Sequence, residues 1–332
     1  MRLKLVALLS CVLLSLGFAQ DSIKVGVISS FTGRFAEFGD QHKAGFQVAL
    51  EEINANGGIN GVPLELVIED DTSDQKAALS SAEKLAQAGL PMVLGAYSSS
   101  ITNPLAQYFT REQLPFVVFT SSADSITNPG SDWVYRINQP AATYAEILFD
   151  VFDYLRSEGQ DINNVAVVHG NGTFENAVAI ASQELALTRG YRIVELQSYD
   201  KGLTDFRPIL NRFKSKNPDV ILMVSYSEDA VAIVRQVKEL GVAPKVMVGA
   251  AAGFALPSFI EGAQDAAEGV ITATAWTAEV NYEGAQDLYE RLVAAKGGEP
   301  SYHAAQAYAG LITAADVLRR SSDMSPESIR QA

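Results

Sequence analysis

The sequence predicts an α/β protein of two doubly wound lobes, each a parallel sheet with helices on both faces. Short apolar runs rich in β-branched or aromatic residues alternate with amphipathic stretches along most of the chain. The length of 332 residues suggests two domains rather than one. The alternation pauses at 136–142, which includes Pro140, and this break separates two series of strands and helices.

The first series predicts one lobe. On its first helix Phe46, Ala49 and Ile53 fall on one face, as in a helix that packs on a sheet. The predicted strands are 23–29, 64–69, 92–95 and 116–119, and the predicted helices are 39–54, 74–88 and 102–112.

The second series predicts the other lobe, and after it the alternation of strands and helices ends. Its strands are 165–169, 192–196, 220–224 and 246–248, and its helices are 143–157, 175–189, 205–214 and 227–240. After 269–274 only helices follow, at 285–295 and 303–318. The chain stops at Ala332 inside a stretch that still looks helical, so we expect a C-terminal part to be truncated. We assign 20–139 and 276–332 to lobe 1, and 140–275 to lobe 2.

The first 19 residues are typical of a secretory signal peptide. Arg2 and Lys4 give a basic start, an apolar run covers 5–16, and Gly17 and Ala19 suit a signal peptidase. That run, at ~12 residues, is shorter than the ~20 that span a bilayer. We therefore expect an exported protein, periplasmic or extracellular.

Cysteine content and charge exclude several classes of site and partner. Cys11, the single cysteine, lies inside the apolar run, whereas a lipid-attachment cysteine would follow it. The mature chain would then have no disulfide and no thiolate zinc site. Its net charge of −14 becomes −16 when Arg2 and Lys4 leave with the signal peptide. Such acidity repels phosphate backbones, so we expect no nucleic-acid partner.

Motifs for catalysis or a cofactor are missing. The sequence has no Gly-x-Ser-x-Gly elbow and no phosphate loop, and His42, His169 and His303 lie far apart without metal-ligand spacing. Gly170-Asn171-Gly172 follows a strand, as a dinucleotide loop does, but Glu175 at the third glycine position would repel a pyrophosphate. We expect no enzyme, no cofactor and no metal.

Hydroxyl side chains gather where strands of the first lobe end. The clusters are 29–33, 97–100 and 120–124. In open parallel sheets the carboxyl ends of strands line the ligand crevice, and serine hydroxyls and helix N-terminal amides there can receive a carboxylate. The alternative is that these residues, Ser100 and Thr102 above all, are only helix N-caps.

Four motifs carry a resemblance to a known family. They are Ser-Ser-Phe-Thr-Gly at 29–33, Phe-Gly-Asp at 38–40, Glu-Ile-Asn-Ala-Asn-Gly-Gly-Ile-Asn-Gly at 52–61 and Glu-Asp-Asp at 69–71. From about Ser22 to its end, the chain resembles the type I periplasmic binding proteins of branched-chain and related amino-acid ABC transporters. The resemblance implies two Rossmann-like lobes joined by a multi-strand hinge of three crossings, with a C-terminal part beyond the end of this chain.

The resemblance also implies a function. It implies an extracytoplasmic solute-binding protein, expected to be a monomer, that captures an amino acid or an analogue by hinge closure and then docks on a membrane ABC permease. A ligand-sensing receptor domain of the same fold is the alternative. An enzyme on this scaffold would need a nucleophile–base pair, a metal cluster or a cofactor loop, which the motifs do not supply.

Site residues follow from the resemblance. Residues 98–100 and 121–124 take the positions that hold the carboxylate and amine of an amino acid. Phe38, and either Tyr302 or His303, match aromatics that pack on the ligand, and Tyr226 matches a contact from the second lobe. The expected ligand-binding residues are Phe38, Tyr97, Ser98, Ser99, Ser100, Ser121, Ser122, Ala123, Asp124, Phe174, Tyr226, Ala251, Tyr302 and His303.

Three departures from the family pattern bear on the ligand. Branched-chain members have an acidic residue for the ammonium where this chain has only glycine and alanine, at 249–253. They also have a threonine in place of Asp124, and a disulfide that Thr72 and Tyr97 cannot form. We hypothesise that Asp124 holds the ligand's ammonium from the first lobe; the alternative is a solvated carboxylate at the rim.

The exported protein should begin at Gln20 or Asp21, because Gly17-Phe18-Ala19 has the small residues that signal peptidase requires. Intact mass spectrometry of the secreted chain checks this. A retained N-terminus, or a lipid on Cys11, would contradict it.

Overall fold

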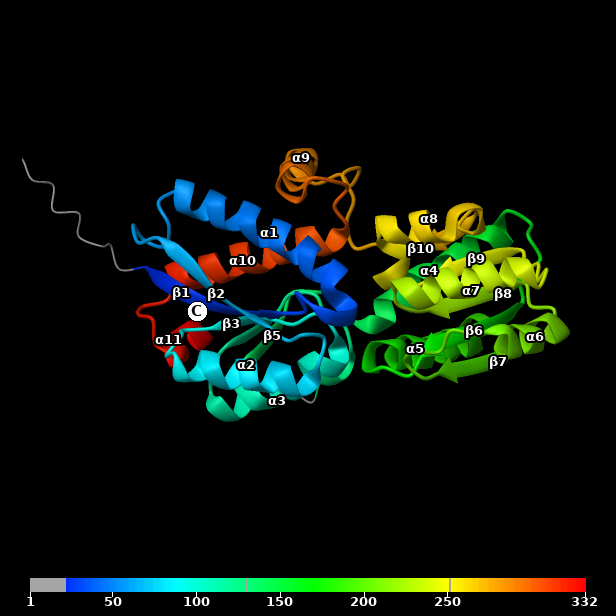
Figure 1. Cartoon of the computed structure of the whole chain (residues 1–332), viewed down its shortest axis with the longest axis horizontal. Coiled ribbons are helices and arrows are strands. Elements are labelled where there is room, and N and C mark those ends of the chain that lie inside the picture. Colours follow the sequence, from blue (N-terminus) through cyan, green and yellow to red (C-terminus); the bar gives the residue numbers. More distant parts are fainter. Residues whose placement is uncertain (1–21, 129, 251) are drawn as a thin grey trace, which may run out of the picture.

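A computed structural model describes residues 22–128, 130–250 and 252–332 as two α/β lobes placed end to end (Figure 1). The expected signal peptide at 1–19 and the candidate site residue Ala251 lie outside the described residues. Within the part of the chain that is described, no helix is long and apolar enough to cross a membrane.

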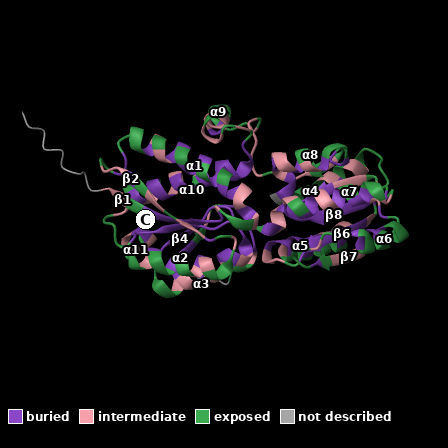
Figure 2. Cartoon of the chain, viewed as in Figure 1, coloured by how far each residue is buried: buried purple, intermediate pink, exposed green. Residues whose placement is uncertain are grey.

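The first lobe contains a five-stranded parallel sheet in the order β2-β1-β3-β4-β5. Its inner strands are buried on both sides (Figure 2), which accounts for their continuous apolar sequence. The strands are β1 (Ile23–Ser29), β2 (Leu64–Asp70), β3 (Val93–Gly95), β4 (Phe116–Val118) and β5 (Val134–Arg136). Helices α1 (Ala36–Ala55), α10 (Tyr302–Arg320) and α11 (Pro326–Gln331) pack on one face, and α2 (Gln75–Gln87) and α3 (Ser99–Glu112) on the other.

The second lobe repeats this plan, with strand order β10-β9-β8-β6-β7, all parallel. The strands are β6 (Asn164–Gly170), β7 (Arg192–Tyr199), β8 (Val220–Val224), β9 (Val246–Gly249) and β10 (Val270–Thr272). Helices α4 (Ala141–Ser157) and α5 (Thr173–Arg189) cover one face, and α6 (Arg207–Lys216), α7 (Ser227–Glu239) and α8 (Pro257–Ala263) the other. The predicted fold class of two doubly wound lobes is confirmed. The division at 139/140 and 275/276 stays a prediction.

The strand order places the functional region. In each sheet the chain winds outward in both directions, from β1 to β2 and β3, and from β6 to β7 and β8. Between such diverging connections, the loops at the carboxyl ends leave a crevice in which ligands bind. This rule makes the loops after β1, β3, β6 and β8 the candidates for a site, and the loop after β4 follows the strand next to β3.

Three elements differ from the sequence-based expectation. The three-residue strand β5 lies at the edge of the predicted break, because an edge strand this short leaves no periodic pattern. Helix α8 is also short and was not predicted. Helix α3 begins at Ser99 rather than at residue 102, with Ser98 at its N-cap position, so neither Ser100 nor Thr102 caps it.

Helix α9 (Ala285–Lys296) lies apart from the sheet, against α1 (Figure 1). Beneath it, α1 and α10 approach each other closely at Gly45. A Cβ at Gly45 would lie 2.1 Å from the carbonyl oxygen of Ala304. Only glycine permits this separation of the two helices, so Gly45 helps to seat α10 on the first lobe.

Gly45→Ala should lower the free energy of unfolding by about 1–3 kcal/mol, because the added methyl group forces the two helices apart. Urea denaturation followed by circular dichroism measures the change. Gly298→Ala is the matched control, since a Cβ there meets only the end of Lys296, 3.8 Å away. Equal stability of the two variants would contradict the close packing.

Candidate ligand-binding site

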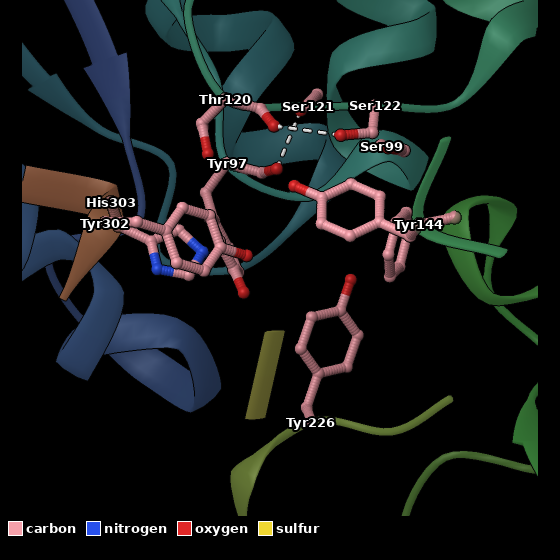
Figure 3. Close-up of a pocket in the computed structure, with 10 residues that line it drawn as sticks. Tyr97, Ser99, Thr120, Ser121, Ser122, Tyr144, Tyr226, Tyr302 and His303 are labelled. Atoms are coloured by element: carbon pink, nitrogen blue, oxygen red, sulfur yellow. Dashed lines mark hydrogen bonds between the residues drawn. The ribbon is translucent and has the colours of Figure 1, made fainter. Parts of the chain in front are cut away.

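A small cavity of about 30 Å³ lies between the lobes at the carboxyl ends of the strands (Figure 3). Residues of both lobes form its wall. This is the place in a parallel sheet, beyond the carboxyl ends of the strands, where ligands usually bind. The lining residues are Tyr97, Ser99, Thr120, Ser121, Ser122, Tyr144, Phe174, Tyr226, Tyr302 and His303. Eight of the fourteen predicted site residues are among them. The predicted residues that do not line it are Phe38, Ser98, Ser100, Ala123 and Asp124, and Ala251 lies outside the described residues.

The hydroxyl of Ser121 is committed to the fold. Its Oγ lies 2.8 Å from the carbonyl oxygen of Ala96, 2.7 Å from that of Tyr97 and 2.6 Å from the hydroxyl of Thr102. These contacts join the loop after β4 to the loop after β3. Ser121 therefore shapes the cavity floor, and its single proton is already shared among protein acceptors.

Other hydroxyls around the cavity keep bonding capacity. Ser99 Oγ accepts the backbone N–H of Ala123 at 3.2 Å, and Ser122 Oγ accepts the side-chain amide of Asn138 at 2.5 Å. A hydroxyl that accepts one bond can still donate its own proton. Ser122 also contacts the carbonyl oxygen of Thr120 at 3.4 Å and hydrogen-bonds the Tyr144 hydroxyl, so a ligand that takes its proton must replace these partners.

Two of the predicted serines join the lobes instead of lining the cavity. Ser100 Oγ accepts the backbone N–H of Thr173 at 3.0 Å, so a residue of the first lobe satisfies the first turn of α5 in the second. The Ser98 side chain hydrogen-bonds the Tyr226 hydroxyl. These contacts exist only while the lobes are together.

Aromatic rings form the apolar side of the cavity. Tyr302 stacks on His303 with ring centroids 4.0 Å apart, and Tyr97 stacks at 4.1 Å on Phe38, which does not itself line the cavity. Tyr226 reaches across from the second lobe, with its ring 6.0 Å from that of Tyr97 (Figure 3). Burial raises the pKa of both Tyr97 and Tyr226 well above its usual value, so both hydroxyls stay protonated.

The cavity wall carries no formal charge. Among the described residues that line it there is no aspartate, glutamate, lysine or arginine. Burial, with His42 nearby, holds the pKa of His303 well below its usual value, so this ring is neutral. What the wall offers a ligand is hydroxyl groups and ring surfaces.

Asp124 lies away from this cavity. It begins a short 3₁₀ turn, its side chain is 50% exposed, and Oδ1 lies 3.7 Å from Nη2 of Arg136. The neighbouring Ala123 is buried but does not line the cavity either. This placement fits a solvated carboxylate, the alternative reading of Asp124, and Asp124 has no part in the function proposed below.

Sequence reasoning missed two lining residues, Thr120 and Tyr144. Thr120 begins a hydroxyl cluster that was singled out, so its signal was present. Tyr144 lies in the first turn of α4, and its hydroxyl hydrogen-bonds the side chains of Ser122 and Tyr302. Its only signal was a tyrosine directly after the predicted crossing between lobes.

A family model described as periplasmic binding protein matches residues 22–332. The chain belongs to this family. Within it, the relationship to the type I proteins of the branched-chain amino-acid group is confirmed by both sequence and structure. The predicted resemblance therefore holds.

Three relatives illustrate the relationship of this periplasmic binding protein. A Leu/Ile/Val-binding protein homolog of Brucella melitensis is 30% identical over 72% of this chain. A leucine-, isoleucine-, valine-, threonine- and alanine-binding protein of Pseudomonas aeruginosa is 25% identical over 96% of this chain and 83% of its own. The structure of LivJ from Streptococcus pneumoniae in complex with isoleucine superposes with a TM-score of 0.83 at 25% identity, covering 94% of this chain and 87% of that one.

The chain spans 61% of the length of the Brucella relative. By their names, the Pseudomonas relative is an amino-acid-binding protein and LivJ is a substrate-binding protein of a branched-chain amino acid transporter.

His42 should stay neutral throughout pH 5–8, because complete burial lowers its pKa to about 3 and Nδ1 lies 2.7 Å from Ser29 Oγ. NMR of the ring nitrogens as a function of pH measures this. The unfolded chain binds this proton near 6.5, so the contribution of His42 to stability is present above that pH and is lost as pH falls toward 3. A titration step near 6.5 in the folded protein would contradict the burial.

Proposed function

We propose that this protein is exported and captures an amino acid, or a closely related small carboxylate, between its lobes for delivery to an ABC permease. The observation that carries the proposal is the cavity itself. It lies at the switch points of two parallel sheets and is walled by hydroxyls from one lobe and by rings from both. No catalytic role is proposed for it.

The carboxylate of the ligand would bind at the first lobe. Ser99 can donate its proton, Ser122 can do so by giving up its hydrogen bond with Tyr144, and α3 begins at Ser99 with its N–H groups directed out of the first turn. The N-terminus of a helix favours negative charge, and hydrogen bonds to an ionised oxygen are stronger than neutral ones. These donors suit a carboxylate better than a cation.

The apolar part of the ligand would lie against the rings. Tyr97, Phe174 and Tyr302 line the cavity. Such rings bury much apolar surface while the tyrosine hydroxyls keep polar partners. The names of the relatives, which refer to leucine, isoleucine and valine, support an aliphatic side chain here.

Closure would couple binding to delivery. A ligand in this position touches both lobes only when they are together, so it favours the closed form by its extra contacts there. Export by the predicted signal peptide, a monomeric state and docking of the closed form on the permease complete the proposal.

A thermal-shift screen of the mature protein should detect a ligand among aliphatic amino acids and their deaminated analogues. A ligand at a hundredfold excess over its dissociation constant adds about 2.7 kcal/mol to the free energy of unfolding. Leucine, isoleucine, valine, threonine and alanine are the first compounds to test, each paired with its 2-keto acid. A screen with no response to any carboxylate would count against the proposal.

Ser122→Ala and Ser99→Ala should each weaken binding of the ligand found in that screen by about 1–3 kcal/mol, because each removes a hydrogen bond to a charged group. Isothermal titration calorimetry measures the change, with circular dichroism as the check on folding. Ser157→Ala, at the exposed end of α4, is the control and should bind as the wild type does. Unchanged affinity in both cavity variants would reduce these serines to structural residues.

A further inference from the structure

A buried group of charged side chains joins the two lobes beside the cavity. Arg34 comes from the 3₁₀ turn Gly33–Phe35 of the first lobe. Asp229 and Glu175 lie in the first turns of α7 and α5 in the second lobe. We call Arg34, Asp229 and Glu175 the inter-lobe charge cluster. None of the three lines the cavity.

Arg34 and Asp229 form a direct ion pair between the lobes. Nη2 of Arg34 donates to Oδ2 of Asp229, and the two side chains are only 17% and 8% exposed. The Tyr199 hydroxyl donates to the same oxygen at 3.1 Å. The guanidinium also lies 5.6 Å from the ring centre of Tyr226, so it contacts the second lobe twice.

Glu175 is enclosed by a glycine loop of its own lobe. A Cβ at Gly170 would lie 2.8 Å from one carboxyl oxygen of Glu175, and a Cβ at Gly172 would lie 2.4 Å from the other. Gly170-Asn171-Gly172, the motif that resembled a dinucleotide loop, thus folds around a carboxyl group. Glu175 is only 6% exposed there.

The groups that face Glu175 include one cation. Arg34 lowers its pKa and Asp229 raises it, but burial is the largest effect and raises the pKa of Glu175 to about 7. Tyr97, Tyr199 and Tyr226 act on it from three other segments, as neutral phenols whose pKa burial raises.

The other polar groups near Glu175 are a histidine and two hydroxyls. Burial lowers the pKa of His169, at the end of β6, and disfavours its charged form, and its Nδ1 lies 2.8 Å from the Gly170 carbonyl oxygen. From α4, the Tyr144 ring lies 5.7 Å from that of Phe174, and from α3, Ser100 Oγ accepts the backbone N–H of Thr173. The cluster therefore sets one guanidinium against two carboxyl groups.

We propose that Arg34 is the positioning residue that holds the two lobes closed, and that closure takes up one proton at Glu175. One guanidinium can neutralise one carboxylate, and the Arg34 guanidinium is already paired with the carboxylate of Asp229. A second ionised carboxylate in the same buried cluster would be an unpaired charge, which is costly. The closed form avoids this by protonating Glu175. Opening withdraws Tyr97 and the Ser100 contact of the first lobe from the start of α5, so that water can reach Glu175 past the glycine loop and its pKa falls toward the ordinary value of 4.5.

The sign of the pH dependence follows from these two states. The pKa of Glu175 is higher in the closed form, so closure is favoured fully below about 4.5 and weakens as pH rises toward 7. Within that window the closed-to-open ratio falls by up to about tenfold per pH unit, the limit for one proton. The proposal uses the lobe motion of the proposed function, but it does not depend on which ligand binds.

Two spin labels measure closure directly, without any ligand. Cys11, the single cysteine, lies in the expected signal peptide and is left out of the protein to be labelled, so Gln87→Cys on α2 and Asn211→Cys on α6 place one label on the exposed surface of each lobe. Pulsed electron paramagnetic resonance then gives the fraction of molecules at the shorter, closed distance. In this background we expect a larger closed fraction at pH 5.5 than at pH 8.

Variants of the inter-lobe charge cluster distinguish the role of Arg34 in holding the lobes closed from the role of Glu175 in proton uptake. Glu175→Gln imitates the protonated side chain, so its closed fraction should be high and equal at both pH values. Arg34→Met should lower the closed fraction at both. Glu184→Gln, an exposed carboxyl on the same helix α5, is the matched control and should keep the pH dependence of the parent protein.

Three results would overturn the proposal: a closed fraction in the parent protein that is the same at both pH values, a pH dependence that survives in Glu175→Gln, or a closed fraction unaffected by Arg34→Met. The parent pH series and Arg34→Met decide the matter even if Glu175→Gln fails to fold. No amino acid is added, so a failed ligand screen would leave this result standing, and the reverse is also true.

Discussion

Two parallel sheets present their carboxyl ends to each other, and every feature of the cleft depends on this arrangement. A parallel strand sends its side chains to the two sheet faces, which helices cover, and only the loop after it can reach a ligand. Tyr97, Thr120, Phe174 and Tyr226 all lie just beyond a strand for this reason. Residues distant in sequence meet there because four strands end at one place.

Hydrogen-bond satisfaction then divides the hydroxyls of the cleft into two groups. Ser121 uses its proton between two loops, and Ser100 accepts an N–H from the facing lobe. Ser99 accepts one bond from the protein and keeps its proton to donate, and Ser122 shares a hydrogen bond with the Tyr144 hydroxyl that a ligand could replace. A buried polar group without a partner costs stability, so the first group holds the cleft in shape while the second can serve a carboxylate.

Charge is kept out of the cavity and placed beside it. The lining residues are uncharged, whereas Arg34, Asp229 and Glu175 are buried together at the contact between the lobes. Such a cluster gives the closed form specific contacts that the open form lacks. It also makes the lobe motion sensitive to protonation, because one cation cannot balance two buried carboxylates.

The sequence by itself determined the fold class, because a strand buried on both faces needs a continuous apolar run and each covering helix needs an amphipathic stripe. It also located the hydroxyl clusters at strand ends, and the motif at 52–61 carried the family. It could not tell on which side of its loop Asp124 lies, since neighbours in sequence need not share a surface. Only the tertiary structure decided that Tyr144 enters the cavity and that Arg34 meets Asp229, a residue 195 positions away, because such contacts depend on how the lobes come together and leave no local pattern.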